Sequence, residues 1–287
     1  MRVASARSRV AAVAACALAL AVPASAAAVT TRTFTTSQSE FYDGYRNQGW
    51  WSGQPGVVNT DDNANYVASR SADASQQNFF TFDLGELPGS CAVRAATLRL
   101  TRAEGSGTGT LTYELWDVST PAATLNHNVG TSAATATDLS SGTSFGRFPV
   151  DSATSLPHDE VLSFPLNGAG LAAISAARGA FFSIGGALAP SDNGYLFGFS
   201  DNVGTQELVV SCGSLPTKKA ECKNGGWRDF GVFRNQGECV VFVVDRAARA
   251  CTFDRVAHGE AAFRAKYGAG PRHLFAMLVC IHRRIGS

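Results

Sequence analysis

The chain is poor in lysine, in closely spaced cysteines and in long apolar runs. After residue 28 no stretch approaches the roughly 20 apolar residues that a helix needs to cross a bilayer, so we expect no membrane span. No two cysteines form a C-x2–4-C pair and the five histidines are scattered, which argues against a zinc site. All four lysines lie after residue 216, so the composition changes along the chain.

The first 28 residues have the order of a secretory signal peptide. Three arginines among the first nine residues precede an apolar run over Val10–Val22, and the small-residue segment Pro23–Ala26 follows. This order predicts that residues 1–26 are removed and that the mature protein is secreted into an extracellular, oxidising space. An alternative is a lipoprotein box that ends at Cys16, although only six apolar residues precede this cysteine.

Charge divides the mature chain into two regions. Residues 27–216 hold eight arginines, no lysine and 17 acidic residues, a net of −9, whereas residues 217–287 hold 13 basic and six acidic residues, a net of +7. This asymmetry predicts two units, a domain at 27–216 and a basic, cysteine-containing region at 217–287. The basic region would dock on the domain, bind an anionic cell-wall polymer, or remain a solvated surface. We expect no nucleic acid partner, and the oligomeric state stays open.

Six cysteines remain once the leader is removed, and an even count in a secreted chain predicts three disulfides. We favour sequential pairing because it respects the two units. The first bond would close a loop of about 120 residues, worth about 4–5 kcal/mol in the chain-entropy account. The favoured pairs are Cys91–Cys212, Cys222–Cys239 and Cys251–Cys280.

Apolar and polar residues alternate along much of the acidic region. Strict alternation runs over Thr97–Thr101 and Thr110–Val118, and a period of two with one apolar face is typical of a half-buried strand. Clusters of Gly, Ser, Thr, Asn and Asp separate such runs and favour turns. The pattern predicts a mainly β, antiparallel, jelly-roll-like sandwich. Further strands are expected at Thr33–Phe41, Asn78–Leu84, Val161–Leu166, Ala180–Leu188, Gly194–Ser200 and Glu207–Cys212.

Helices are expected at one place in the domain and in the basic region. Asn167 would cap a helix over Gly168–Ala177. Asn235–Glu238 fits a capping box, although the β-branched run that follows leaves a strand as the alternative. Glu260–Tyr267 and His273–His282 predict two further helices. The C-terminal segment is therefore expected to be small, partly helical and stapled by disulfides.

A family resemblance rests on five segments of the acidic region, which are Asn78–Leu84, Ala96–Leu100, Tyr113–Pro121, Gly185–Leu188 and Gly194–Gly198. Together they resemble a family of secreted bacterial β-sandwich proteins. The resemblance covers about residues 33–212. It implies the sandwich fold and export, and it brings no activity and no functional residues with it.

The basic region carries its own short motifs. Cys222–Trp227 and Asn235–Val240 together resemble a disulfide motif that ends many exported actinobacterial proteins, and Phe263–Gly268 resembles another such ending. Having both in series is less usual, so the resemblance does not imply how the two pack together. It too implies export and no functional residues.

An aromatic cluster near residue 50 is the favoured ligand-binding feature. Trp50 and Trp51 stand close in sequence to Tyr66, and also to Tyr42 and Tyr45. Exposed aromatic rings stack on sugar rings, so we expect Trp50, Trp51 and Tyr66 to bind a glycan. The alternative is that at least one tryptophan belongs to the core, because neighbours on a strand face opposite ways.

A cluster of oxygen ligands follows the tryptophans. Asp61, Asp62 and Asn65 offer the hard oxygens that Ca²⁺ takes, so they are the expected calcium ligands. The segment lacks the EF-hand pattern, and the alternative is a hydrated turn. No other cofactor is expected.

Catalytic signals are weak and scattered. Gly142–Gly146 matches G-x-S-x-G with Ser144 as the nucleophile, but the strand–turn–helix context is missing. His158–Glu160 places an imidazole beside two carboxylates, yet adjacent residues point apart. We therefore assign no catalytic residue.

These observations favour a secreted, non-enzymatic binding module for cell-surface or extracellular polysaccharide. One alternative is a secreted carbohydrate hydrolase, which needs two carboxylates at a set separation. Its candidates are Asp159, Glu160, Asp192 and Asp201. The other alternative is a structural envelope or matrix protein with no small ligand.

Overall fold

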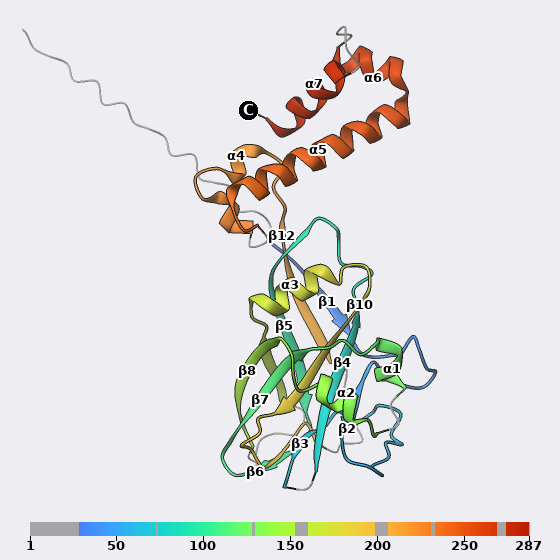
Figure 1. Ribbon diagram of the computed structural model, residues 1–287, viewed down its shortest axis with the longest axis vertical. Helices are drawn as coiled ribbons and strands as arrows, with labels where there is room; N and C mark the ends of the chain where they lie inside the picture. The colour runs from blue at the N-terminus through green and yellow to red at the C-terminus, as the bar shows by residue number, and fades with distance from the viewer. Residues whose placement is uncertain are drawn as a thin grey trace, which may run out of the picture.

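The structure is a computed structural model in which a β-sandwich carries a helical region beyond one end (Figure 1). It describes residues 29–72, 74–127, 130–152, 160–198, 206–230, 233–268 and 274–286. The predicted signal peptide, and with it the alternative at Cys16, therefore lies outside the described residues. The chain is mainly β with antiparallel pairing between its strands, which confirms the predicted fold class.

One sheet has four strands in the order β1-β12-β5-β9. Its members are β1 (Thr30–Thr35), β5 (Cys91–Arg102), β9 (Glu160–Pro165) and β12 (Glu207–Ser214). Cys212 of β12 lies opposite Thr30 on one side and Val93 on the other. This register brings the start of β5 beside the end of β12, although the two strands are far apart in sequence.

The second sheet has eight strands in the order β6-β11-β3-β4-β10-β7-β8, and β2 pairs with β4. Its members are β2 (Gln48–Ser52), β3 (Ala68–Arg70), β4 (Ser75–Asp83), β6 (Gly105–Gly107), β7 (Thr110–Asp117), β8 (Ser144–Asp151), β10 (Phe181–Leu188) and β11 (Gly194–Leu196). The long strands β4, β10 and β7 form its centre.

The main apolar core draws side chains from both sheets. Phe80 and Phe82 of β4 and Leu98 of β5 are fully shielded from solvent. The rings of Tyr113 and Phe164, which come from different sheets, lie 5.1 Å apart. Burying one such large apolar side chain stabilises a fold by about 1.5–3 kcal/mol, so this core accounts for much of the sandwich's stability.

Three short helices belong to the sandwich. In α3 (Gly168–Ala176), the Asn167 side chain accepts a 2.9 Å hydrogen bond from the Ala169 amide, which confirms the predicted cap. The other two, α1 (Ala122–Asn126) and α2 (Ala133–Asp138), lie beside β2 and the centre of the second sheet (Figure 1). They cover part of the outer face of the second sheet, which the alternation of apolar and polar residues in the sequence would predict to be exposed to solvent.

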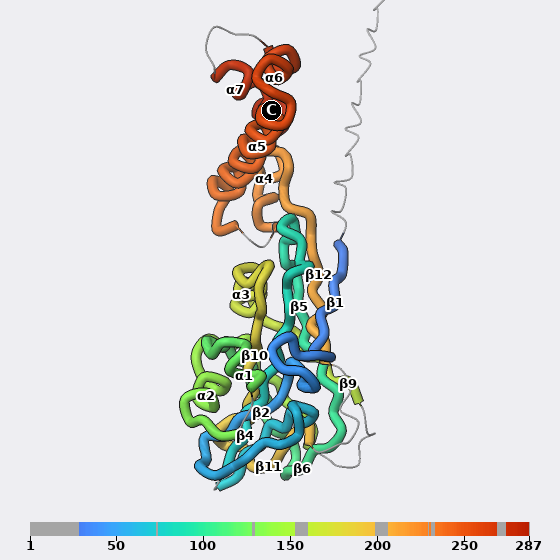
Figure 2. The backbone as a smooth tube through the Cα atoms, turned by 90° about the vertical axis from the view of Figure 1, so that its right-hand side faces the viewer, coloured from blue at the N-terminus to red at the C-terminus, as the bar shows by residue number. Residues whose placement is uncertain are grey.

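The C-terminal region is helical. Its elements are α4 (Lys219–Cys222), the 3-10 helix η1 (Gly226–Phe230), α5 (Gln236–His258), α6 (Glu260–Tyr267) and α7 (Leu274–Ile285). The Asn235 side chain accepts a 2.9 Å hydrogen bond from the Glu238 amide, so the predicted cap starts α5 and the helix prevails over the strand. The region stands beyond the end of the sandwich where β5 and β12 meet (Figure 2).

All three predicted disulfides are present. Cys91–Cys212 joins β5 to β12, Cys222–Cys239 joins α4 to α5, and Cys251–Cys280 joins α5 to α7. Two of the bonds thus fasten the helical region, where each lies in a small apolar cluster of its own. None of the helices in the described ranges combines the length and the apolar character that a bilayer crossing requires.

Two predicted strands are too long. The strand expected over Thr33–Phe41 ends at Thr35, because the Ser39 hydroxyl accepts hydrogen bonds from the amides of Phe41 and Tyr42 and turns the chain. The strand expected from Gly194 ends at Leu196, because Phe197 takes the left-handed conformation, with φ +63°.

Candidate functional site

The three aromatic residues expected to bind a glycan are buried. The exposed fractions of Trp50, Trp51 and Tyr66 are 6 %, 4 % and 0 %. The Trp51 indole donates a 3.2 Å hydrogen bond to the Leu125 carbonyl, and the Tyr66 hydroxyl donates to the Thr101 carbonyl. A stacking platform needs exposed ring faces, so these side chains do not form one, and both tryptophans fit the alternative that at least one of them belongs to the core.

The cause is burial on both faces of β2. This strand pairs with β4, and every one of its residues is buried. Trp51 packs with Phe79 of β4, with Leu125 of α1 and with Leu139, which follows α2. Helical cover on the outer face is a tertiary feature, and strand periodicity does not report it.

The three expected calcium ligands belong to one turn. Burial raises the pKa of the Asp61 carboxyl, and the nearby Trp50 indole and backbone amides only partly oppose this shift. Asp62 is exposed with φ +51°, while the Asn65 side chain accepts a 3.1 Å hydrogen bond from the Val67 amide. Within the described ranges no three His, Cys, Asp or Glu side chains gather as metal ligands. Calcium binding therefore stays a prediction, which this geometry does not strengthen.

Those residues considered for catalysis that the structure describes have structural roles. Ser144 begins strand β8, so it does not stand on a nucleophile elbow. Glu160 forms a 2.7 Å ion pair with Arg102, and Asp192 accepts a hydrogen bond from the Thr112 amide. His158, Asp159 and Asp201 lie outside the described residues.

The C-terminal region, residues 217–287, gathers the positive charge, and we call it the cationic unit. It holds 13 of the 24 basic residues and every lysine. Most of these side chains are exposed to solvent. The exposed ones are Lys218, Lys223, Arg228, Arg234, Arg246, Arg249, Arg255, Lys266, Arg283 and Arg284.

The acidic side chains described in the cationic unit have local partners. Glu221 accepts hydrogen bonds from the backbone amides of Thr217 and Lys218, and Glu238 accepts one from the Arg234 amide. The ion pairs within the unit are Asp245–Arg249, Glu260–Arg255, Asp254–His258 and Asp254–Lys266. The acids thus serve caps and pairs, and the basic surplus stays on the surface.

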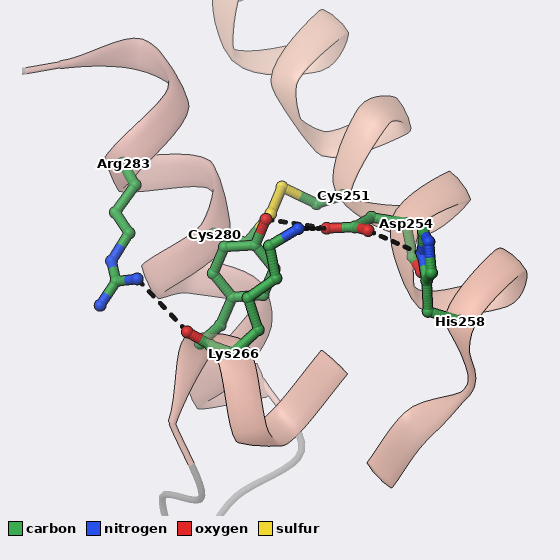
Figure 3. Close-up of polar contacts among 7 residues, drawn as sticks. Cys251, Asp254, His258, Lys266, Cys280 and Arg283 are labelled. Atoms are coloured by element: carbon green, nitrogen blue, oxygen red, sulfur yellow. Dashed lines mark hydrogen bonds and ion pairs between the residues drawn. A yellow bond between two sulfur atoms is a disulfide. The ribbon is translucent and has the colours of Figure 1, made fainter. Parts of the chain in front are cut away.

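Asp254 organises the far end of the unit, as Figure 3 shows. Its carboxylate accepts hydrogen bonds of 2.8 Å from the Tyr267 hydroxyl and 3.0 Å from Lys266 Nζ, and it lies 2.9 Å from His258 Nδ1. The Tyr267 and Lys266 hydrogen bonds lower the pKa of Asp254. This network joins α5 to α6 beside the Cys251–Cys280 bond.

No motif in the sequence marks the Asp254 network. The sequence feature that could have indicated one of its contacts is the position of His258 four residues after Asp254, because side chains at i and i+4 meet on a helix. The contacts with Lys266 and Tyr267 depend on how α6 folds back, which spacing does not reveal. The cationic surface itself was visible in the charge count.

No protein-family model matches the chain, and no curated protein matches it. The resemblance to secreted sandwich proteins and to exported endings therefore stays a prediction.

Proposed function

We propose that this is an exported, non-enzymatic binding protein whose cationic unit attaches it to an anionic cell-wall polymer. The observation that carries the proposal is the outward display of ten Lys and Arg side chains on one disulfide-bonded unit of net charge +7. A surface of this kind attracts polyanions, whereas the acidic sandwich repels them. With the cationic unit bound to the polymer, the sandwich would be held at the cell surface.

The placement of the unit supports access for a polymer. The helices stand beyond the end of the sandwich (Figure 2). The ion pairs described for the unit join residues of the unit to one another. Where unit and sandwich meet, the Arg94 guanidinium of the sandwich lies over the Phe230 ring at 5.4 Å. The basic side chains of α5 and α7 are thus presented to the surroundings.

Export is supported by the sulfur chemistry. Disulfides persist in oxidising compartments, and the two small clusters of the unit offer little core to hold it without them. The mass of the mature N-terminus tests this part of the proposal. A chain that starts after Ala26 or Ala28 supports export as a free protein, and a lipid on Cys16 would contradict it.

A pair of matched variants tests the attachment. Retention of the full mature protein on a poly(glycerol phosphate) resin is compared with retention on uncharged dextran. Lys223→Gln with Arg234→Gln should weaken binding by about threefold to tenfold, because exposed charge pairs contribute about 0.2–1 kcal/mol each. Arg32→Gln with Arg70→Gln removes two sandwich charges and should have little effect. Equal losses in both variants, or no retention of the wild type, would contradict the proposal.

A further inference from the structure

We propose a second binding site in the sandwich, a pocket for a neutral sugar ring in the loop Ser37–Arg46. The pocket has a volume of about 380 Å³, which lies in the range of small-molecule sites. Its lining residues are Ser37, Gln38, Ser39, Asp43, Gly44, Tyr45 and Arg46. The proposal does not depend on the cationic unit.

The loop is closed on itself before any ligand arrives. The Asn47 amide donates a 3.2 Å hydrogen bond to the Thr36 carbonyl, so the two ends of the loop are held together. The Asn47 side chain donates to the Gln38 carbonyl, and the Ser39 amide donates 2.9 Å to the Tyr45 carbonyl. Compact loops with joined ends are frequent carriers of function. Prior ordering of this kind lowers the entropy cost of binding.

The loop is also anchored to the sandwich. The Phe41 ring lies 4.8 Å from the Phe181 ring of β10, between ring centroids. The Ser39 hydroxyl accepts from the Phe41 and Tyr42 amides and fixes the turn before the pocket. Gly44 allows the chain to turn back, because it takes φ +83°, which side chains disfavour. A rigid frame thus holds the pocket residues in place.

One half-buried aromatic ring, that of Tyr45, stands among the mostly polar lining residues of the pocket. Tyr45 lines the pocket, and its ring lies 6.0 Å from the Tyr42 ring. Tyr42 is itself stacked on His127, with centroids 4.6 Å apart and planes 16° apart. This stack braces Tyr42 and, through it, Tyr45. An aromatic ring is a large, rigid contact surface of the kind that the C–H face of a sugar covers.

The polar lining selects for hydroxyl groups without net charge. Asp43 offers carboxylate acceptors and the Gln38 carboxamide offers both a donor and an acceptor, while Arg46 adds a positive charge to the lining. The formal charges of Asp43 and Arg46 cancel, so the lining has no net preference for an anion or a cation. Hydroxyls that both donate and accept fit such a set, and a neutral pyranose therefore matches this pocket.

The experiment is a glycan array with the full mature protein, followed by titration calorimetry with the neutral saccharides that bind. Tyr45→Ala should weaken binding at least tenfold, because it removes the ring surface. Tyr45→Phe keeps that surface and should stay within about threefold of the wild type. Asp43→Asn should weaken binding as well, because a charged acceptor becomes a neutral one.

The controls separate this site from the attachment surface. Lys223→Gln with Arg234→Gln should leave saccharide affinity unchanged, and Tyr45→Ala should leave retention on the phosphate polymer unchanged. Circular dichroism and the Tm verify that each variant is folded. Failure of the wild type to bind any neutral saccharide at millimolar concentration, or equal affinity of Tyr45→Ala and wild type, overturns the proposal.

Discussion

The Tyr113 hydroxyl donates a 2.7 Å hydrogen bond to the Asn78 side chain across strand β10, and Gly186 lies beneath that bond. Tyr113 and Asn78 stand on β7 and β4, the two neighbours of β10, and both are fully buried. A Cβ atom at residue 186 would overlap both the Tyr113 hydroxyl and the Asn78 carboxamide. The glycine is therefore required by a close approach in the core.

Gly186→Ala should accordingly destabilise the sandwich by about 3 kcal/mol, because the new methyl group forces two buried polar partners apart. The matched control is Gly168→Ala at the start of α3, where an added Cβ meets nothing within 4 Å. That change should alter the free energy of unfolding by less than about 1 kcal/mol. Urea denaturation measures both, and equal values for the two variants would contradict this account.

The second prediction concerns the Asp254 carboxylate. Its pKa is lowered in the folded protein, so it contributes stability above its unfolded value near 3.8, which is lost as the pH falls through the folded pKa. Tyr267→Phe removes the largest contribution to this shift and should lower the Tm at neutral pH. The difference from wild type should shrink at the acid end. Tyr42→Phe is the control. A loss of Tm in Tyr267→Phe that is the same at every pH would contradict the role given to the Asp254 carboxylate.

Asp61 should behave in the opposite way. Burial raises its pKa in the folded protein, so its contribution to stability is fully present below the unfolded value of 3.8 and is lost as the pH rises through the folded pKa. Asp61→Asn keeps an acceptor for the turn amides and removes the buried charge. We expect unchanged or higher stability at pH 7, measured by urea denaturation at pH 4 and 7.

Asp61→Asn also tests the prediction of calcium binding. If this turn binds calcium, adding the ion should raise the Tm of wild-type protein that a chelator has first stripped of metal. It should have no such effect on Asp61→Asn. A Tm of wild type that does not respond to millimolar calcium would retire the prediction.

The disulfides of the two units should differ in their effects. Cys222→Ser with Cys239→Ser removes the bond at the centre of one small cluster, so the helices near it should unfold while the sandwich stays intact. Far-UV circular dichroism should show lost helix, and limited proteolysis should leave a sandwich fragment. Cys91→Ser with Cys212→Ser should instead destabilise the sandwich, by about 4–5 kcal/mol in the chain-entropy account. Cooperative loss of both units in either variant would contradict the two-unit organisation.

Local signals predicted much of the fold. The caps at Asn167 and Asn235 act within three residues, so the sequence around them suffices. Cysteine parity and the charge boundary predicted all three disulfides. Two-residue alternation located part of β5 and nearly all of β7, because these strands alternate between buried and more exposed residues over much of their length.

Features that depend on distant partners escaped prediction. Trp50 and Trp51 are both buried because α1 and α2 cover a second face of the sheet, and alternation cannot anticipate such cover. Ser37–Phe41, the first half of the Ser37–Arg46 loop, was expected to be part of a strand. The hydrogen bonds that close the loop, from Asn47 to the carbonyls of Thr36 and Gln38, are not visible in a periodic pattern. The pocket residues were therefore missed, although Tyr42 and Tyr45 stood next to the favoured cluster.

The most direct test of the central claim is a salt titration of the wild-type protein on poly(glycerol phosphate). Screening lengths fall from about 10 Å at 0.1 M salt to about 3 Å at 1 M, so attachment through exposed cations should weaken steadily over this range. The proposal predicts strong retention at low salt, loss at high salt, and a weaker salt dependence in Lys223→Gln with Arg234→Gln. Retention that does not change with salt would contradict it.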